Sequence, residues 1–173
     1  SREGADIKAD DLKDIDTGLS YYTTHVDDTK PARSVNIRLA QQRLNYAVGM
    51  AQKDFSVNKY VGTRTADKGY KPAPSYFENK LEQSTGGGVC QTSSTLFNAV
   101  VRADLEIVTR YAHSWPSSYV NKGEDATVNW PSLDFVFRNN GQFPVFVVAW
   151  YANQEVTVEI YGQMLEDGQT IDL

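Results

Sequence analysis

The sequence has a single cysteine, Cys90, which follows Gly86–Gly88 after one valine and begins a run without helix breakers that extends to Leu105. The glycines permit backbone angles and a close substrate approach that side chains would prevent. The first turn of a helix presents free N–H groups and the positive end of the helix dipole, which favour an anion. Because the thiolate is the nucleophilic form of cysteine, the stretch predicts a thiol nucleophile. The same N–H groups can stabilise the oxyanion of an attacked carbonyl.

Two other interpretations of this stretch remain open. A cysteine at the start of a helix can be a small buried hydrophobic residue without a chemical role. Glycine-rich loops before helices also bind phosphate. However, GGGVCQTSS lacks the lysine and the spacing of a P-loop and does not match GxGxxG, so phosphate binding is the weaker hypothesis.

A thiol nucleophile needs a base, and the sequence offers His25 and His113. His113 ends the strand-like run IVTRYAHS, which follows the cysteine helix after a brief turn, so we expect it to lie near Cys90. His25, in YYTTHVDD, is expected on the surface of a strand. A third group should orient the imidazole, and the candidates are Asp125, Asn129 and Asp134. Asp125, between a glycine-containing turn and a predicted strand, is the first choice.

Candidate substrate-binding residues lie around these positions in the sequence. Arg64 and Arg138 have the forked geometry that clamps a carboxylate, although each is equally compatible with a solvated surface charge. Aromatic residues that could stack on sugar or peptide, or belong to the core, are Tyr111, Trp115, Tyr119 and Trp130. The remaining predicted contacts adjoin the cysteine and the histidine and are Gly87, Gly88, Gln91, Ser114 and Trp115.

Composition and charge exclude several classes of protein. With 173 residues the chain fits one domain that can bury a core. Its 17 basic and 22 acidic residues give a net charge of −5, and without a basic stripe we expect no nucleic-acid partner. One cysteine forms no internal disulfide and no zinc cluster, so no metal is expected. The longest apolar run, Val145–Ala152, is too short to span a bilayer, and the start does not resemble a signal peptide.

Hydrophobic periodicity predicts an α+β fold with two main helices packed on a mostly antiparallel sheet and the cysteine at the N-terminus of the central helix. Residues 1–17 are interpreted as a linker or N-terminal extension, and residues 18–173 as the folded domain. The predicted helices are Ser34–Ala47 and Cys90–Leu105. The predicted strands are Leu19–Val26, Ile107–Ser114, Ala126–Trp130, Asp134–Asn139, Pro144–Ala152 and Val156–Gly162. Shorter extended pieces are expected at Phe55–Val61, as strand or loop, and at Ser75–Phe77.

Several long motif strings resemble the VanW domain. They are RSVNIRLAQQRLN, KDFSVNKYVGTRTADKGYKPAP, GGGVCQTSSTLFNAVVRADLEIVTRYAHSWPSSYV, GEDATVNW, DFVFRNNGQFPVFVVAW and VTVEIYG, and together they cover nearly everything from Gly18 to Gly162. The resemblance implies a bacterial protein of the cell-envelope side. It makes Cys90 the nucleophile, His113 its partner and Asp125 the acidic residue of the motif. The chain departs from the family at Glu124, where arginine is expected in many members.

Some VanW domains are similar to a class of L,D-transpeptidases, which implies a peptidoglycan L,D-transpeptidase that forms 3-3 cross-links through a cysteine thioester. Its partners would be stem peptides, a tetrapeptide donor and an acceptor, and no cofactor would be required. The resemblance further implies an extracytoplasmic location on the cell-wall side of the membrane, with an anchor or other wall-associated domains before Ser1. Two alternatives stay open: a cysteine peptidase or amidase acting on cell-wall peptides, and a non-catalytic peptidoglycan-binding module.

Overall fold

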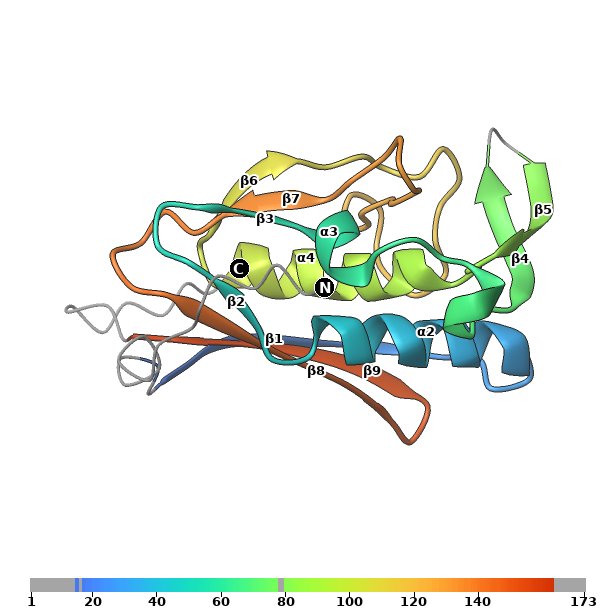
Figure 1. The fold of residues 1–173 in the computed structure, drawn as a ribbon, viewed down its shortest axis with the longest axis horizontal. Coiled ribbons are helices and arrows are strands. Elements are labelled where there is room, and N and C mark those ends of the chain that lie inside the picture. The colour runs from blue at the N-terminus through green and yellow to red at the C-terminus, as the bar shows by residue number, and fades with distance from the viewer. Residues whose placement is uncertain (1–14, 16, 78–79, 164–173) are drawn as a thin grey trace.

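Two long helices and a four-stranded sheet form one half of the fold (Figure 1). The computed structural model describes residues 15, 17–77 and 80–163. Helices α2 (Pro31–Leu44) and α4 (Val89–Arg102) pack next to each other on one face of a sheet with the strand order β1-β9-β8-β2. Its strands, all paired antiparallel, are β1 (Thr17–His25), β2 (Ala47–Gly49), β8 (Val145–Ala152) and β9 (Glu155–Gly162). The predicted α+β class is confirmed.

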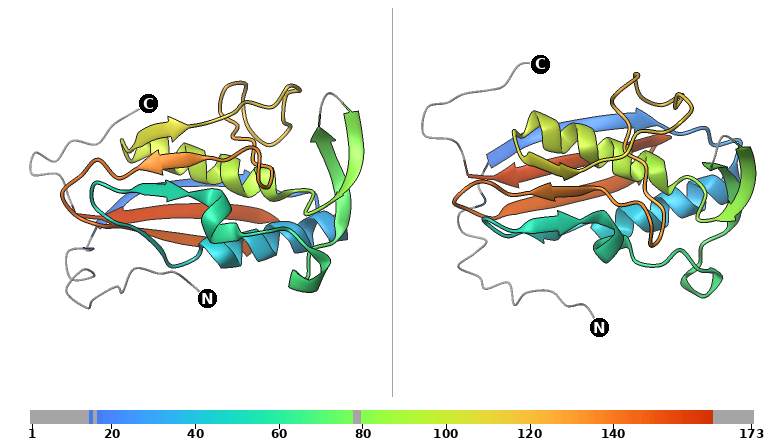
Figure 2. Two further views of the ribbon diagram at one scale, coloured as in Figure 1. Left: turned by 45° about the horizontal axis from the view of Figure 1, so that its top comes forward. Right: turned by 90° about the horizontal axis from the view of Figure 1, so that it is seen from above.

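A second sheet covers the opposite side of α4, so that α4 is the central helix between two sheets (Figure 2). This sheet has the order β3-β7-β6, and its strands are β3 (Asp54–Ser56), β6 (Glu106–Thr109) and β7 (Val136–Arg138). The short helix α3 (Val57–Val61) and the 3₁₀ turn η1 (Ala66–Lys68) lead from it to a hairpin. The hairpin strands are β4 (Pro72–Phe77) and β5 (Lys80–Thr85), which end directly before the glycines that precede α4.

The core explains why α4 occupies the centre. Ten of its fourteen residues are buried, because both of its sides face a sheet. One buried apolar cluster joins α4 to both sheets; its members include Phe55, Leu96, Ala99, Val100, Phe137, Val147, Val158 and Ile160. The helix therefore has little freedom to shift, and its N-terminal residue positions are fixed by packing at both faces.

Six of the ten buried residues of α4 are polar, and some of them bind a segment that crosses the helix. The backbone N–H of Ala126 donates to Ser94 Oγ at 2.9 Å, and Ser93 Oγ donates to the Ala126 carbonyl. Asn98 Nδ2 donates to the Glu124 carbonyl at 2.7 Å. Buried backbone groups need such partners, since leaving them unpaired is costly. The polar side chains of α4 thus fix the segment 124–128 in place of a neighbouring strand.

This arrangement corrects the strand predicted at Ala126–Trp130. The segment is extended, but its backbone groups pair with α4 side chains and with the Tyr111 carbonyl, which accepts from Thr127 N–H at 2.8 Å. One isolated bridge, between Asn129 and Leu133, is its only regular pairing among the described residues. An alternating sequence pattern cannot reveal that hydroxyl and amide side chains of a helix replace the partner strand.

Other predicted boundaries were also wrong. The run Phe55–Val61 divides into β3 and helix α3, because the Ser56 side chain caps the helix by accepting from Lys59 N–H. The strand predicted at Ile107–Ser114 ends at Thr109, and the first helix spans Pro31–Leu44 rather than Ser34–Ala47. The extended piece Ser75–Phe77 is the end of β4, and its partner β5 was not predicted. The consecutive strands β7 and β8 belong to different sheets, whereas the distant β1 pairs with β9.

The predicted linker at residues 1–17 lies outside the described residues except for Ile15 and Thr17. Across the described ranges, no helix is long and apolar enough to cross a membrane.

We predict that Ser94→Ala destabilises the domain by about 1–3 kcal/mol, because it leaves the buried N–H of Ala126 without its acceptor. Urea unfolding followed by circular dichroism measures this free energy. Ser132→Ala, at an exposed serine, is the matched control and should change stability by less than about 0.5 kcal/mol. Equal stability of Ser94→Ala and wild type would contradict the role given to the polar face of α4.

Candidate active site

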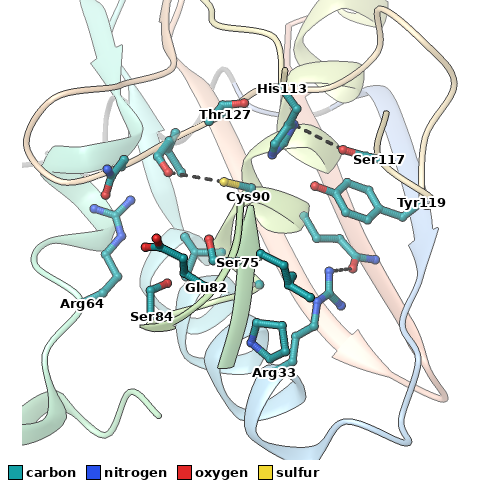
Figure 3. A pocket seen from close by; sticks show the side chains of 18 of the residues that line it. Arg33, Arg64, Ser75, Glu82, Ser84, Cys90, His113, Ser117, Tyr119 and Thr127 are labelled. Atoms are coloured by element: carbon teal, nitrogen blue, oxygen red, sulfur yellow. Dashed lines mark hydrogen bonds between the residues drawn. The ribbon is translucent and has the colours of Figure 1, made fainter. Parts of the chain in front are cut away.

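A cleft of about 1050 Å³ opens at the N-terminal end of α4. The start of α4 forms its floor, and its walls come from the start of α2, the β4–β5 hairpin and the loop that carries His113 and Tyr119 (Figure 3). Cys90 lies in this cleft with a half-buried side chain. An incoming ligand can therefore reach its sulfur, which does not fit the interpretation of Cys90 as an enclosed space-filling residue.

The Val128 carbonyl and the imidazole of His113 are the two groups that bear on the sulfur of Cys90. The Cys90 thiol donates to the Val128 carbonyl at 3.3 Å. His113 lines the cleft together with Cys90, and Cys90 contributes to raising the pKa of its imidazole. Both partners depend on the segment that α4 binds, because Val128 belongs to it and Asp125, in the same segment, holds the imidazole. The packing of 124–128 on α4 therefore positions the thiol and its histidine together.

The imidazole of His113 is fixed by Asp125. His113 Nδ1 lies 2.6 Å from Asp125 Oδ2, and the backbone N–H of His113 donates to the same oxygen. Arg110 binds the other side of the carboxylate, with Nη2 at 3.1 Å from Oδ1 and Nε donating to the Asp125 carbonyl at 2.7 Å. The His113 and Asp125 side chains are 12% and 10% exposed. With Nδ1 occupied, Nε2 is the ring nitrogen left to face Cys90, the arrangement that a Cys-His-Asp triad requires.

The electrostatics of this pair favour a protonated imidazole. Burial by itself lowers the pKa of His113, but the hydrogen bonds and negative charges of Cys90 and Asp125 outweigh it and raise the pKa above its ordinary value. For Asp125, burial raises the pKa, and the hydrogen bonds and charge of His113 more than compensate, so that the pKa is lowered. The raised His113 pKa stabilises the fold at low pH, and this contribution is lost as pH rises through the folded-state value.

The other candidates for the third group lie elsewhere. Asp134 accepts from Ser56 Oγ and from the Asn58 N–H at 2.9 Å, at the start of α3. Asn129 lines the cleft and pairs with Leu133. His25 is exposed on β1, as expected. Among these residues, Asp125 is the carboxylate that contacts His113.

The structure brings some of the predicted substrate-binding residues into the cleft and leaves others outside. Those that line the cleft are Arg64, Gly88, Gln91 and Trp115. Arg138 does not: it lies on β7 and pairs with Asp54 at 3.4 Å, so it is a surface ion pair. Ser114 is exposed and lies outside the lining of the cleft, although its neighbours His113 and Trp115 line it. Gln91 is 1% exposed and uses its side chain for internal hydrogen bonds.

The glycines before Cys90 are needed for packing. Gly88 caps α4 with φ 110°, and a Cβ there would lie 2.8 Å from Arg33 Cγ. Gly87 packs directly against the carbonyl of Ala73 on β4, so it supports the floor of the cleft without lining it. These glycines therefore let α2, the hairpin and α4 approach closely around the sulfur.

Arg33 is a cleft residue that the sequence analysis missed. Its Nη2 donates to Gln91 Oε1 at 2.7 Å, and its guanidinium lies 5.8 Å from the centre of the Tyr119 ring. Burial is the main cause of the raised pKa of Tyr119, and the charge of Cys90 adds to it. Arg33 stands 57 residues before Cys90, at the start of the family-like string RSVNIRLAQQRLN, but nothing in that string indicates that this arginine reaches the cleft.

The aromatic candidates are divided between the cleft and the surface. Trp115 and Trp130 line the cleft and are 61% and 43% exposed. Tyr111 is exposed outside the cleft lining. Glu124, the departure from the family pattern, also lies outside it and accepts from Tyr22 Oη and Asn121 Nδ2. In the part of the chain that the structure describes, no three His, Cys, Asp or Glu side chains gather as a metal site.

Comparison with known proteins finds a matching family model, described as VanW like protein, over residues 32–161. The chain is 41% identical over 144 residues to the Uncharacterized protein YoaR of Bacillus subtilis, covering 83% of this chain and 48% of YoaR. It is 30% identical over 135 residues to the Vancomycin B-type resistance protein VanW of Enterococcus faecalis, covering 75% of this chain and 49% of that protein. The chain thus spans about half the length of these relatives. No solved structure matches it significantly.

We predict that Asp125→Asn lowers the pKa of His113, because the substitution removes the carboxylate charge that stabilises the imidazolium. NMR titration of the imidazole resonances measures the pKa. His25, the second histidine, lies outside this hydrogen-bonded cluster and serves as the internal control in the same spectra. An unchanged His113 pKa would mean that Asp125 does not hold the imidazole in solution.

Proposed function

The chain belongs to the VanW family, and we propose that it is a cysteine-dependent acyltransferase of the bacterial cell wall, an L,D-transpeptidase that forms 3-3 cross-links. The single observation that carries this proposal is that Cys90 and His113 line one open cleft while Asp125 binds the imidazole of His113. The vancomycin-resistance name of one relative connects the family to the cell wall. The proposed substrates are therefore peptidoglycan stem peptides, and the proposed location is the extracytoplasmic side of the envelope.

In the first half-reaction, the thiolate of Cys90 attacks the carbonyl of the third residue of a tetrapeptide donor. Backbone N–H groups at the start of α4 stabilise the oxyanion of the tetrahedral intermediate. The protonated His113 then donates its proton to the nitrogen of the terminal D-alanine as the C–N bond breaks. D-Alanine leaves, and a thioester joins the donor to Cys90.

In the second half-reaction, the side-chain amine of a neighbouring stem peptide attacks the thioester. His113, now neutral, accepts the proton of this amine, while Asp125 stabilises the imidazolium that forms. The C–S bond breaks, the thiolate of Cys90 is regenerated, and a new amide links the two stems. No electrons are exchanged, and the chain's own residues supply every proton transfer.

The dimensions of the cleft support this scheme. A volume of about 1050 Å³ lies at the upper end of ordinary ligand pockets and leaves room for a donor peptide together with the approach of an acceptor. The exposed rings of Trp115 and Trp130 offer apolar surface to the sugar or peptide parts of such a substrate.

We predict that the domain, incubated with disaccharide tetrapeptide, produces a cross-linked dimer with loss of one alanine. Cys90→Ala should abolish the product, and His113→Gln should lower kcat by about 10²- to 10⁴-fold, the usual contribution of a positioned acid–base group. Mass spectrometry detects the dimer, and the intact-protein mass detects a thioester on Cys90, the one cysteine of the chain.

Arg138→Gln is the matched control for this assay, because Arg138 lies outside the cleft and should leave the rate unchanged. Shorter peptides without dimer would instead indicate a cysteine peptidase or amidase. A domain that yields neither product, while Cys90→Ala still binds cell walls, would be a non-catalytic binding module, and the proposed chemistry would be wrong.

A further inference from the structure

Two arginines stand on opposite sides of Cys90 in the cleft, Arg33 from α2 and Arg64 from the loop after α3 (Figure 3). The glycines before Cys90 bring both of them close. A Cβ at Gly86 would lie 2.6 Å from Arg64 Cβ, and a Cβ at Gly88 would lie 2.8 Å from Arg33 Cγ. Both glycines have a positive φ, so the loop is shaped to receive one arginine stem on each side.

Hydrogen bonds fix the direction of each guanidinium. Arg64 donates from Nη2 to Asn58 Oδ1 at 2.8 Å and from Nη1 to the Gly62 carbonyl at 3.0 Å. Asn58 is itself held, because its Nδ2 donates to the Leu133 carbonyl at 2.9 Å. These bonds occupy two of the five N–H donors of the guanidinium and leave the others available to a ligand.

Arg33 is held in a similar way on the other side. Gln91 Oε1 accepts from its Nη2, while Gln91 Nε2 donates to Thr24 Oγ1 at 2.9 Å and to the His25 carbonyl at 2.7 Å. Because the amide of Gln91 is fixed by β1, it directs Arg33 toward the cleft. This hydrogen bond uses one of the N–H donors of Arg33. The buried Gln91, which we expected to touch the substrate, is thus a positioning residue for Arg33.

Neither arginine forms an ion pair with a carboxylate of the described chain, unlike Arg110 with Asp125 and Arg138 with Asp54. Two acids share the cleft with them. Asp27 pairs with Lys30 and accepts from Thr29, and Glu82 is exposed on β5. Burial lowers the pKa of both Arg33 and Arg64, which reflects the water that they have lost. Partly desolvated guanidinium groups without an ion-paired carboxylate favour an anionic ligand.

We propose that Arg33 and Arg64 bind two different carboxylates of one acyl donor, one on each side of the carbonyl that Cys90 attacks. This inference rests on the proposed function and narrows its substrate class to donors with two acidic groups. One is the terminal carboxylate of the leaving residue, and the other belongs to the acyl part of the peptide. A peptide held at both ends presents the carbonyl between them to the sulfur, which lowers the entropic cost of attack.

The experiment measures peptide binding without turnover. In a Cys90→Ala background, calorimetry gives the Kd of a tetrapeptide and of three forms in which one of its carboxylates at a time is amidated. Arg33→Gln and Arg64→Gln should each weaken binding of the unmodified peptide by about 10- to 100-fold, the usual value of a charge-assisted contact. For each variant, amidation of one particular carboxylate should then leave the Kd unchanged. That carboxylate should differ between Arg33→Gln and Arg64→Gln.

Matched variants separate ligand contact from general damage. Arg138→Gln should leave every Kd unchanged, because its side chain is paired with Asp54 outside the cleft. Arg33→Lys keeps the charge without the fork and should bind the unmodified peptide between wild type and Arg33→Gln. Thermal unfolding of every variant identifies any that does not fold. If Arg33→Gln does not fold, Arg33→Lys is compared with wild type in its place.

Two results would overturn the inference. The first is that the unmodified peptide does not bind. The second is that each arginine variant weakens binding by the same factor whichever carboxylate of the peptide is amidated. Its failure is distinct from failure of the proposed function. If the wild type forms cross-links but the binding losses from variants and from amidation are additive, only the two-carboxylate site is rejected. If each arginine is coupled to one carboxylate as expected but the wild type transfers no acyl group, only the proposed reaction is rejected.

Discussion

The site depends on one constraint, the binding of the segment 124–128 to the buried polar face of α4. Ser93, Ser94 and Asn98 supply the hydrogen bonds that a neighbouring strand would otherwise give to this segment. Because Cys90 lies on the same helix one to two turns earlier, the segment and the sulfur share one rigid frame. Asp125 is fixed within that segment, and through it the imidazole of His113. The relative placement of Cys90, His113 and Asp125 is therefore a consequence of how a helix satisfies the backbone of a loop.

Charge is distributed around the sulfur in a way that fits acyl transfer. His113, whose pKa is raised, and two partly buried guanidinium groups line the cleft around Cys90, where the proposed reaction would develop negative charge on the sulfur and then on the oxyanion. Asp125 lies on the far side of the imidazole, where Arg110 also neutralises it. The His113–Asp125 pair, to which the proposed mechanism assigns the proton transfers, is thus distinct from Arg33 and Arg64, which are proposed to bind the ligand.

Comparison of prediction and structure shows which signals a sequence carries. Strands β1, β8 and β9 and helix α4 were predicted close to their observed positions, because their apolar residues repeat with the period of a strand or helix and face one core. The strand predicted at Ala126–Trp130 was wrong because its partners are side chains of a helix. The hairpin strand β5 was missed because its residues are all exposed and polar ones dominate, so no pattern marks it. Arg138 was predicted to bind substrate and Arg33 was not, because the motif strings do not indicate which arginine side chains face the cleft.

The sequence by itself determined the α+β class, the family resemblance and the position of Cys90 at the start of a central helix, because these follow from local periodicity, glycine placement and motif strings. It also identified His113 and Asp125 as candidates, but it left Asn129 and Asp134 as alternatives to Asp125 for the group that orients the imidazole. Only the tertiary structure decided which acid meets the imidazole, that Gln91 orients an arginine, and that Arg33 and Arg64 line one cleft with Cys90. The physical reason is that these contacts join residues 12 to 58 positions apart or lie across the cleft, where packing and the pairing of buried polar groups, rather than local pattern, fix the neighbours.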